Sequence, residues 1–378
     1  MTKKQKKQKK EEKQLKKNPV DFTMMITILL LLALGLVMVL SASSPTSLAK
    51  YNNSYVFFVK QLIFGALGVI AMCIISKIDY RFWKNFYKIG YIISIISLIL
   101  VLVIGKTINE SRRWIYIGPL SIQPSEIVKF LMIIFYATIL TKDKDNLKFY
   151  WKGLVKNFLY LVPIIGLLLL EPHFSVSIVI IGICSIMMIM AGCKFKHFLC
   201  TGISVGIPGI IYLVIKEKYR LRRVLTFIDP WQDKTGKGWQ VIQSLYAIGS
   251  GGLFGAGLGE SKQKYLYLPE PHNDFIFSVL AEELGFVGCV FVIALFAILI
   301  WRGILAAMNA KDMFGSLVAI GITSLIAIQV IINIAVVTSS IPATGMPLPF
   351  FSYGGTALFL LLCEMGVLLN ISRSTTKL

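Results

Sequence analysis

The sequence predicts an all-α, polytopic helical membrane protein with about ten transmembrane helices and a long extracellular loop before the eighth. Its mean hydropathy is +0.73, 56% of its 378 residues are hydrophobic and only 15% are charged, which is too apolar for an ordinary soluble domain. The apolar residues come in runs of about 20, the length that spans a bilayer core. These runs do not alternate with period two, which excludes a closed β-barrel.

The hydrophobic runs place ten spans along the chain, to within a few residues at each boundary. The fifth and sixth are separated only by Glu171, Pro172 and His173, which predicts a tight pair of short or broken helices. The expected spans are 22–41, 55–76, 85–104, 123–140, 157–170, 174–191, 198–215, 276–301, 314–336 and 353–371.

Basic residues set the expected topology. The first 17 residues hold nine lysines and no long apolar run, so residues 1–20 are predicted to be a basic, disordered cytoplasmic tail. Residues 21–378 are predicted to form a single ten-span domain. An even number of spans puts both termini on one side, where most of the 39 lysines and arginines then fall, and the positive-inside rule makes that side the cytoplasm.

The composition also bears on partners and metals. The net charge of +20 suits the anionic inner face of a membrane, and no motif or aromatic context points to nucleic acid. The six cysteines form no CxxC pair and are interpreted as packing residues. The three histidines lack the spacing of a zinc site, so no metal site built by the protein is predicted. The first span is too long for a signal-peptide core.

Three polar segments, rich in glycine and proline, fall on the predicted outer side: 105–126, 216–274 and 337–356. Irregular backbone near membrane depth is tolerated only where it is buried in protein or lines a wet cavity. We therefore expect these segments to share one outward-facing cavity. The long loop, 216–275, also contains a stretch, 239–248, that fits an amphipathic interfacial helix.

An unusual density of ionisable groups lies in the stretch YLPEPHNDFIFSVLAEELGFVG, residues 267–288. Asp274 follows two prolines and precedes a helix that is expected to begin near Phe275. The local sequence allows it to cap that helix, to act as a general base at the membrane surface, or to do both. A helix N-terminus lowers the pKa of a carboxylate, so a useful base there would need additional burial.

Two adjacent glutamates, Glu282 and Glu283, lie further along the same predicted helix. Adjacent residues cannot face the same way on a helix. We favour a buried ion pair with a lysine or arginine of another span over a catalytic role. Glu270 receives no role from the sequence.

A second polar cluster begins with Arg112, Arg113 and Trp114. Arginine binds phosphate through a planar, bidentate fork, and an interfacial tryptophan is either a membrane anchor or a platform for a ligand. Glu126 and Lys129 lie three residues apart on one helix face and can pair, a structural arrangement more often than a catalytic one.

The long loop carries many basic residues and a glycine-rich run, GSGGLFGAGLG, at Gly249–Gly259. The basic residues suit lipid headgroups or a pyrophosphate. The glycine run is a weak phosphate signal because no strand precedes it, and a hinge or a close backbone approach explains it equally well.

Three stretches, 111–130, 267–288 and 342–356, together with the glycine run and the ten-span layout, resemble the SEDS family (shape, elongation, division and sporulation). This family includes the RodA and FtsW glycosyltransferases. The resemblance implies a peptidoglycan glycosyltransferase that acts on lipid II at the outer face of the cytoplasmic membrane, with a class B penicillin-binding protein as partner. It maps an essential aspartate onto Asp274. Where family members often carry QPDLGT, this chain has EPHFSVS, which leaves that corner out of the predicted site.

The resemblance implies a reaction in which Asp274 is the general base for a sugar hydroxyl, with inversion at the donor's anomeric carbon. A divalent cation, Mg or Mn, is a possible cofactor that would stabilise the leaving pyrophosphate. Alternatives from other classes are a flippase for the lipid-linked precursor and a scaffold that recruits a transpeptidase. The predicted substrate-binding residues are Arg112, Arg113, Trp114, Glu126, Lys129 and His272.

Overall fold

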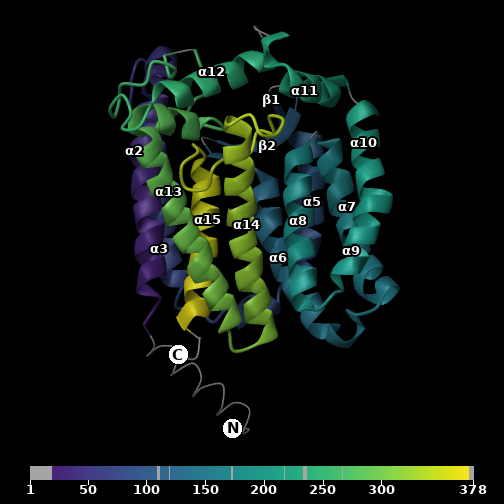
Figure 1. Cartoon of the computed structure of the whole chain (residues 1–378). Coiled ribbons are helices and arrows are strands. Elements are labelled where there is room, and N and C mark those ends of the chain that lie inside the picture. The colour runs from purple at the N-terminus through teal and green to yellow at the C-terminus, as the bar shows by residue number, and fades with distance from the viewer. Residues whose placement is uncertain are drawn as a thin grey trace.

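The structure, a computed structural model, describes residues 19–373 apart from 109–110, 119, 172, 217, 233–235 and 266. Within these residues, ten helical segments are long and apolar enough to cross a membrane, which confirms the predicted number. They run side by side as a bundle (Figure 1). The predicted basic tail lies almost entirely outside the described residues.

The ten spans follow the predicted order. The fifth begins with a π-helical turn, η2 (Tyr150–Val155), and the seventh contains another, η3 (Gly202–Gly206). The helices are α2 (Phe22–Tyr51), α3 (Val56–Ile75), α5 (Tyr87–Ile104), α6 (Pro124–Lys142), α7 (Lys156–Leu170), α8 (Phe174–Ala191), α9 (Phe195–Thr201) with α10 (Ile207–Lys216), α13 (Ile276–Met308), α14 (Met313–Val337) and α15 (Gly355–Arg373).

The predicted end of the first span is the largest error in these boundaries. Helix α2 continues to Tyr51 through residues 42–50, which include four Ser or Thr residues and a lysine, and ends where Asn52 adopts a left-handed conformation, with φ 54°. Hydropathy marks the membrane-embedded part of a helix, whereas hydrogen bonding and capping determine where the helix stops.

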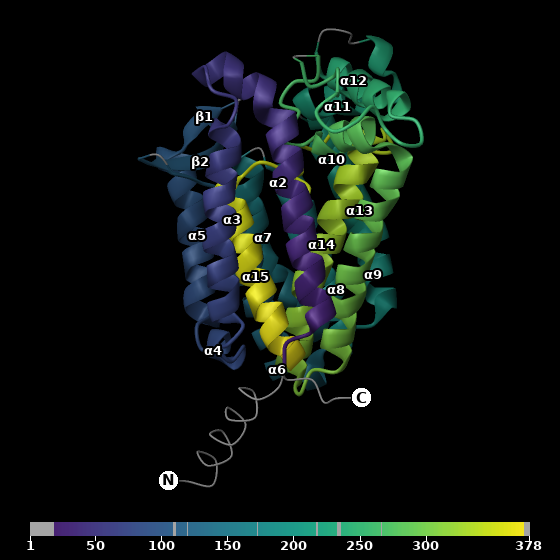
Figure 2. The ribbon, with the colours of Figure 1, turned by 90° about the vertical axis from the view of Figure 1, so that its left-hand side faces the viewer.

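Both ends of the described chain lie at one end of the bundle (Figure 2). The backbone N–H of Asp21, just before α2, donates to Ser372 Oγ near the end of α15, at 3.4 Å. The side chain of Asp21 caps α2 and also lies 2.7 Å from Arg302 Nε. The side chain of Asp312 caps α14 and lies 2.8 Å from Arg81 Nε.

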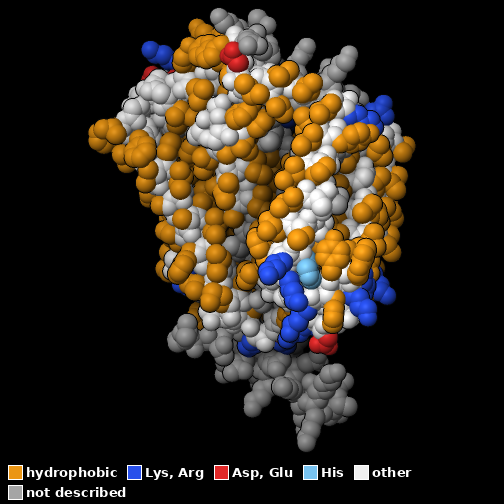
Figure 3. Space-filling view, turned by 45° about the vertical axis from the view of Figure 1, so that its right-hand side comes forward, with side chains coloured by type: hydrophobic (Ala, Val, Ile, Leu, Met, Phe, Trp, Pro, Cys, Tyr) orange, Lys and Arg blue, Asp and Glu red, His pale blue; other side chains and the backbone are white. Residues whose placement is uncertain are grey.

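Close packing and an apolar flank characterise the bundle. Small residues bring α3 and α15 together, because a Cβ atom on Gly68 would lie 2.4 Å from Leu362 Cδ1 and one on Gly366 would lie 2.8 Å from Met72 O. Exposed hydrophobic side chains cover the flank, whereas charged side chains gather toward the ends (Figure 3). This distribution is expected of a protein surrounded by lipid.

The opposite end of the bundle carries the irregular segments. A three-stranded antiparallel sheet, β1 (Lys106–Ile108), β2 (Ser111–Ile117) and β3 (Leu120–Ile122), precedes α6. Two helices, α11 (Lys218–Ile228) and α12 (Lys237–Ser250), lie across this end (Figure 1). The helix expected at 239–248 is therefore present within the predicted loop, whereas the short strands were not predicted.

Candidate functional site

A cavity of about 500 Å³ opens at the end where the irregular segments meet. Its polar lining includes Arg113 of β2, Asp274 in the loop before α13 and Tyr353 in the segment before α15. Apolar side chains of α3 and α15, among them Phe64 and Leu361, line it as well. All three predicted polar segments contribute, which confirms that they share one cavity.

The backbone around Asp274 is fixed by neighbouring elements. The carbonyls of residues 272–274 accept hydrogen bonds, in turn, from Tyr353 N (2.8 Å), Ser352 Oγ (2.8 Å) and Asn333 Nδ2 (2.9 Å). Asn333, on α14, also donates to Met346 O at 2.8 Å. These residues hold the Asp274 loop against the segment between α14 and α15, a function that the sequence analysis did not assign to them.

The carboxyl group of Asp274 has the properties of a base. Helix α13 begins at Ile276 and receives no side-chain cap at its N-terminus, so the capping interpretation of Asp274 is wrong. Burial and the nearby Glu270 raise the pKa of Asp274 to about 6, while Arg223 and Arg113 oppose the shift. A carboxyl group with this pKa is largely ionised at neutral pH and accepts a proton more readily than an ordinary aspartate.

The two adjacent arginines differ in position. Arg113 and Trp114 line the cavity and are half-buried. Arg112 is exposed, lies outside the lining, and donates from Nη1 to Leu102 O at 3.3 Å. The structure therefore brings only the second arginine of the predicted pair to the cavity.

An ion pair lies at the start of α6. Lys129 Nζ is 2.8 Å from Glu126 Oε2 and the lysine side chain is only 2% exposed, which confirms that these two residues pair. Both line the cavity, as do Glu364 of α15 and Lys60 of α3. The sequence analysis missed Glu364 and Lys60, although a lone charge inside an apolar span is itself a signal for function.

The corner that departs from the family pattern also reaches the cavity. His173 lines it and is almost completely buried, with Nε2 3.4 Å from Gln123 Nε2. The neighbouring Glu171 is buried too, and burial raises its pKa to about 8, against the opposing effect of Arg113.

His272 lies behind the cavity lining. Its ring stacks on Phe57, with centroids 4.9 Å apart and planes at 25°, and meets the edge of Tyr353 at 5.8 Å. Burial lowers the pKa of His272 to about 4. In this position the imidazole is a neutral packing group between α3 and the segment before α15.

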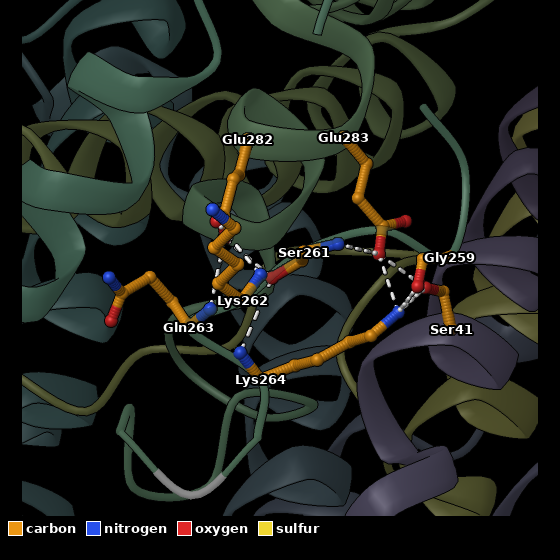
Figure 4. A network of polar contacts seen from close by, with 8 residues as sticks. All are labelled: Ser41, Gly259, Ser261, Lys262, Gln263, Lys264, Glu282 and Glu283. Atoms are coloured by element: carbon orange, nitrogen blue, oxygen red, sulfur yellow. Dashed lines mark hydrogen bonds and ion pairs between the residues drawn. The ribbon is translucent and has the colours of Figure 1, made fainter. Parts of the chain in front are cut away.

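The two glutamates of α13 lie outside the cavity lining. Glu283 Oε1 is 2.9 Å from Lys264 Nζ, and both side chains are buried (Figure 4). The predicted buried ion pair is confirmed, but the lysine comes from the loop before α13 and not from another span.

No group of three or more His, Cys, Asp or Glu side chains is arranged to hold a metal ion in the part of the chain that the structure describes. Asp274 and Glu270 are the two carboxylates of the loop before α13 that line the cavity. Carboxylate oxygens of this kind suit Mg²⁺ or Mn²⁺.

The fold and the cavity define a polytopic α-helical membrane protein with a polar site at one end of its bundle. Residues 22–377 match the cell cycle protein family of FtsW, RodA and SpoVE, and the chain belongs to this family. It is 46% identical to stage V sporulation protein E of Bacillus subtilis over 360 residues, which cover 95% of this chain and 98% of that protein. It is 40% identical to the probable peptidoglycan glycosyltransferase FtsW of Trichlorobacter lovleyi, over 93% of both chains.

Solved structures agree with this membership. A chain from a peptidoglycan synthase complex superposes with a TM-score of 0.78 and 28% identity, covering 94% of this chain and 98% of that one. The rod shape determining protein RodA of Thermus thermophilus superposes with a TM-score of 0.69 and 26% identity, covering 95% and 98%.

Proposed function

We propose that this protein is a peptidoglycan glycosyltransferase that polymerises lipid II into glycan strands at the outer face of the cytoplasmic membrane. The observation that carries the proposal is Asp274, whose pKa burial raises to about 6 on a cavity that also holds Arg113. Relatives that bear the name peptidoglycan glycosyltransferase over nearly the whole chain favour this reaction over transport of the precursor.

In the proposed reaction, a sugar 4-hydroxyl attacks the anomeric carbon of a muramyl sugar linked to undecaprenyl pyrophosphate. Asp274 accepts the hydroxyl proton as the new C–O bond forms. The bond to the pyrophosphate breaks in the same step, its electrons leave with the phosphate oxygen, and the α linkage becomes β by a single inversion.

The basic residues of the cavity lining differ in how well they can bind the pyrophosphate of the substrate. Lys129 is neutralised by Glu126 at 2.8 Å, so its contribution to holding an anion is reduced. Arg113 and Lys60 are the other basic residues of the lining, and we assign them to the pyrophosphate. A bound Mg²⁺ or Mn²⁺ would share this charge when present.

The apolar part of the cavity suits the lipid portion of the substrates. Phe57, Phe64 and Leu361 line it beside the polar groups, so a prenyl chain on the bilayer side can stay in an apolar environment while the sugars stay in water. With both termini in the cytoplasm, as the basic residues predict, the cavity faces outward. A class B penicillin-binding protein would crosslink the product.

The test is a lipid II polymerisation assay with purified protein in lipid nanodiscs, with and without Mg²⁺ or Mn²⁺ and with the transpeptidase partner. Asp274→Asn keeps the size of the side chain and removes the base, so we expect a loss of about 10²- to 10⁴-fold in kcat. The matched control is Asp145→Asn, an exposed aspartate at the opposite end of the bundle, which leaves the rate unchanged. Normal polymerisation by Asp274→Asn would show that Asp274 is not the base. Absence of polymerisation by the wild type under all of these conditions would contradict the proposed function.

A further inference from the structure

Helix α13 is interrupted at Gly285, near its N-terminal end. Gly285 has φ 66° and ψ −166°, which is not helical. The carbonyls of residues 282–283 accept hydrogen bonds from the N–H groups of residues 256–257, at 2.9 and 3.1 Å, and the N–H groups of residues 286–287 donate to the carbonyls of residues 252–253, at 2.9 and 3.1 Å. The glycine-rich run thus supplies the hydrogen bonds that an unbroken helix would make with itself.

This contact explains why the run is rich in glycine. A Cβ atom on Gly251 would lie 2.0 Å from Ala281 O, and one on Gly255 would lie 2.1 Å from Glu283 O. Gly255 also has φ 81°, a conformation that favours glycine. The run is a close backbone approach, one of the two explanations that the sequence left open.

Next to the break, one lysine ties three elements together (Figure 4). Lys264 Nζ donates to Glu283 Oε1 on α13 at 2.9 Å, to Ser41 Oγ on α2 at 3.0 Å and to Gly259 O of the glycine run at 2.6 Å. An ammonium group has three donors, and all three are used here. The side chains of Lys264 and Glu283 are 4% and 0% exposed, so the pair is shielded from water and from salt.

The neighbouring glutamate binds the same loop by a different set of contacts. Glu282 accepts from Ser261 Oγ at 2.5 Å, from Lys262 N at 2.9 Å and from Gln263 N at 3.4 Å. Residues 261–264 are thereby fastened to residues 282–283, and the intervening chain, which includes Asp274, becomes a closed loop.

We propose that Lys264, Glu282 and Glu283 are positioning residues that hold the loop bearing Asp274 at the cavity, with the glycine run as the support for the broken helix. Asn333, Ser352 and Tyr353 hold residues 272–274 of this loop. The charged cluster holds the start of the loop, residues 261–264. Loss of the cluster displaces Asp274 from the reacting hydroxyl without removing any group that touches substrate. This role rests on the proposed function, because it assumes that Asp274 is the base.

The chain contains a matched control for this cluster. Helices α2 and α13 are also joined at the other end of the bundle, where Arg302 Nε donates to Asp21 Oδ2 at 2.7 Å. Arg302→Met therefore breaks an ion pair between the same two helices, far from the cavity. A general loosening of the helix pair would appear in this variant too.

The experiment compares Lys264→Met, Glu283→Gln, their double variant and Arg302→Met in nanodiscs. We measure kcat and KM for lipid II, thermal unfolding, and hydrogen exchange of the amides in 260–275. For Lys264→Met we expect kcat to fall about 10- to 100-fold with KM changed less than about twofold, since a small misplacement of a reacting group has this cost. Amide exchange in 260–275 should accelerate, while Arg302→Met matches the wild type in kcat and in exchange.

The double variant separates positioning from stability. It leaves no unpaired charge in the buried site, so its thermal stability should recover relative to Lys264→Met, yet its kcat should stay low because the tie is absent. Recovery of kcat together with stability would overturn the proposal, as would unchanged exchange in 260–275. If the wild type itself does not polymerise lipid II, the proposed function fails, and the exchange measurement still decides whether the cluster fixes the loop. Should Lys264→Met not fold, Ser41→Ala removes one acceptor of Lys264 Nζ and one donor to Glu283 Oε1 while keeping the ion pair, and it is read in the same way.

Discussion

The ion pairs at the two ends of the bundle differ in how far their side chains are exposed. At the end that holds both ends of the described chain, the Arg81–Asp312 side chains are 37% and 33% exposed, and those of Lys156–Asp143 are 47% and 31% exposed. At the cavity end, the side chains of Lys264 and Glu283 are 4% and 0% exposed, and that of Lys129 is 2% exposed.

The backbone differs between the ends in the same sense. The non-glycine residues with positive φ among the described residues are Asn52, Glu270, Ser339 and Phe350, all in segments at the cavity end. Strained conformations persist only where the surrounding structure enforces them, and they concentrate at functional sites. The difference teaches that the strained backbone conformations of non-glycine residues belong to the cavity end, whereas aspartate side chains cap α2 and α14 at the other end.

The largest expected difference between the ends is in the energy of breaking an ion pair. Lys129→Met removes the buried partner of Glu126, whose side chain is 13% exposed, and should lower the free energy of unfolding by about 3 kcal/mol. Arg81→Met at the other end breaks a pair whose side chains are 37% and 33% exposed and should lower it by less than about 1 kcal/mol. Thermal unfolding in detergent compares the two, and equal shifts would contradict the contrast between the ends.

Disrupting a close backbone contact at the cavity end should lower the free energy of unfolding nearly as much as breaking the buried ion pair. Gly255→Ala places a methyl group 2.1 Å from Glu283 O at a positive φ, so we expect a loss of about 3 kcal/mol in stability. A Cβ atom on Gly166, in α7, would meet no other atom within 4 Å, and Gly166→Ala should stabilise the helix by about 0.5–1 kcal/mol. Opposite signs of the two changes in unfolding temperature would support this assignment.

The neighbouring arginines offer a comparison within the cavity end itself. Arg113→Met removes a cation from the lining and should reduce kcat/KM about 10- to 100-fold. Arg112→Met alters an exposed side chain outside the lining and should change kcat/KM less than about threefold. Steady-state polymerisation rates of the two variants decide which arginine serves the site.

The smallest effect expected is on pH dependence. Because the pKa of Asp274 is raised to about 6, the base form predominates above pH 6 and is lost as the pH falls, so kcat/KM should drop about fivefold from pH 6 to pH 5. Arg113 opposes the rise in this pKa, so the midpoint in Arg113→Met should move to higher pH. A profile that is flat down to pH 5 would contradict the role of Asp274 as base.

The sequence predicted much of the fold because hydropathy acts locally. Each apolar run of about 20 residues must span the bilayer as a helix, whatever its neighbours are, so the number and order of the spans followed from the chain alone. The same reasoning placed the three polar segments at one cavity and paired Glu126 with Lys129. It failed at 42–51, where α2 continues as a polar helix, and at β1–β3, whose short strands depend on one another for pairing.

The sequence by itself determined the fold class, the shared cavity and Asp274 as the candidate base. The tertiary structure alone decided that Arg113 and not Arg112 reaches the cavity, that His272 packs behind it, and that Lys60, His173 and Glu364 line it. It also decided that Glu283, just before the break in α13, pairs with Lys264 of the preceding loop. The physical reason is that local composition fixes which segments enter the membrane, whereas burial, charge pairing and the direction of a side chain depend on segments far apart in sequence.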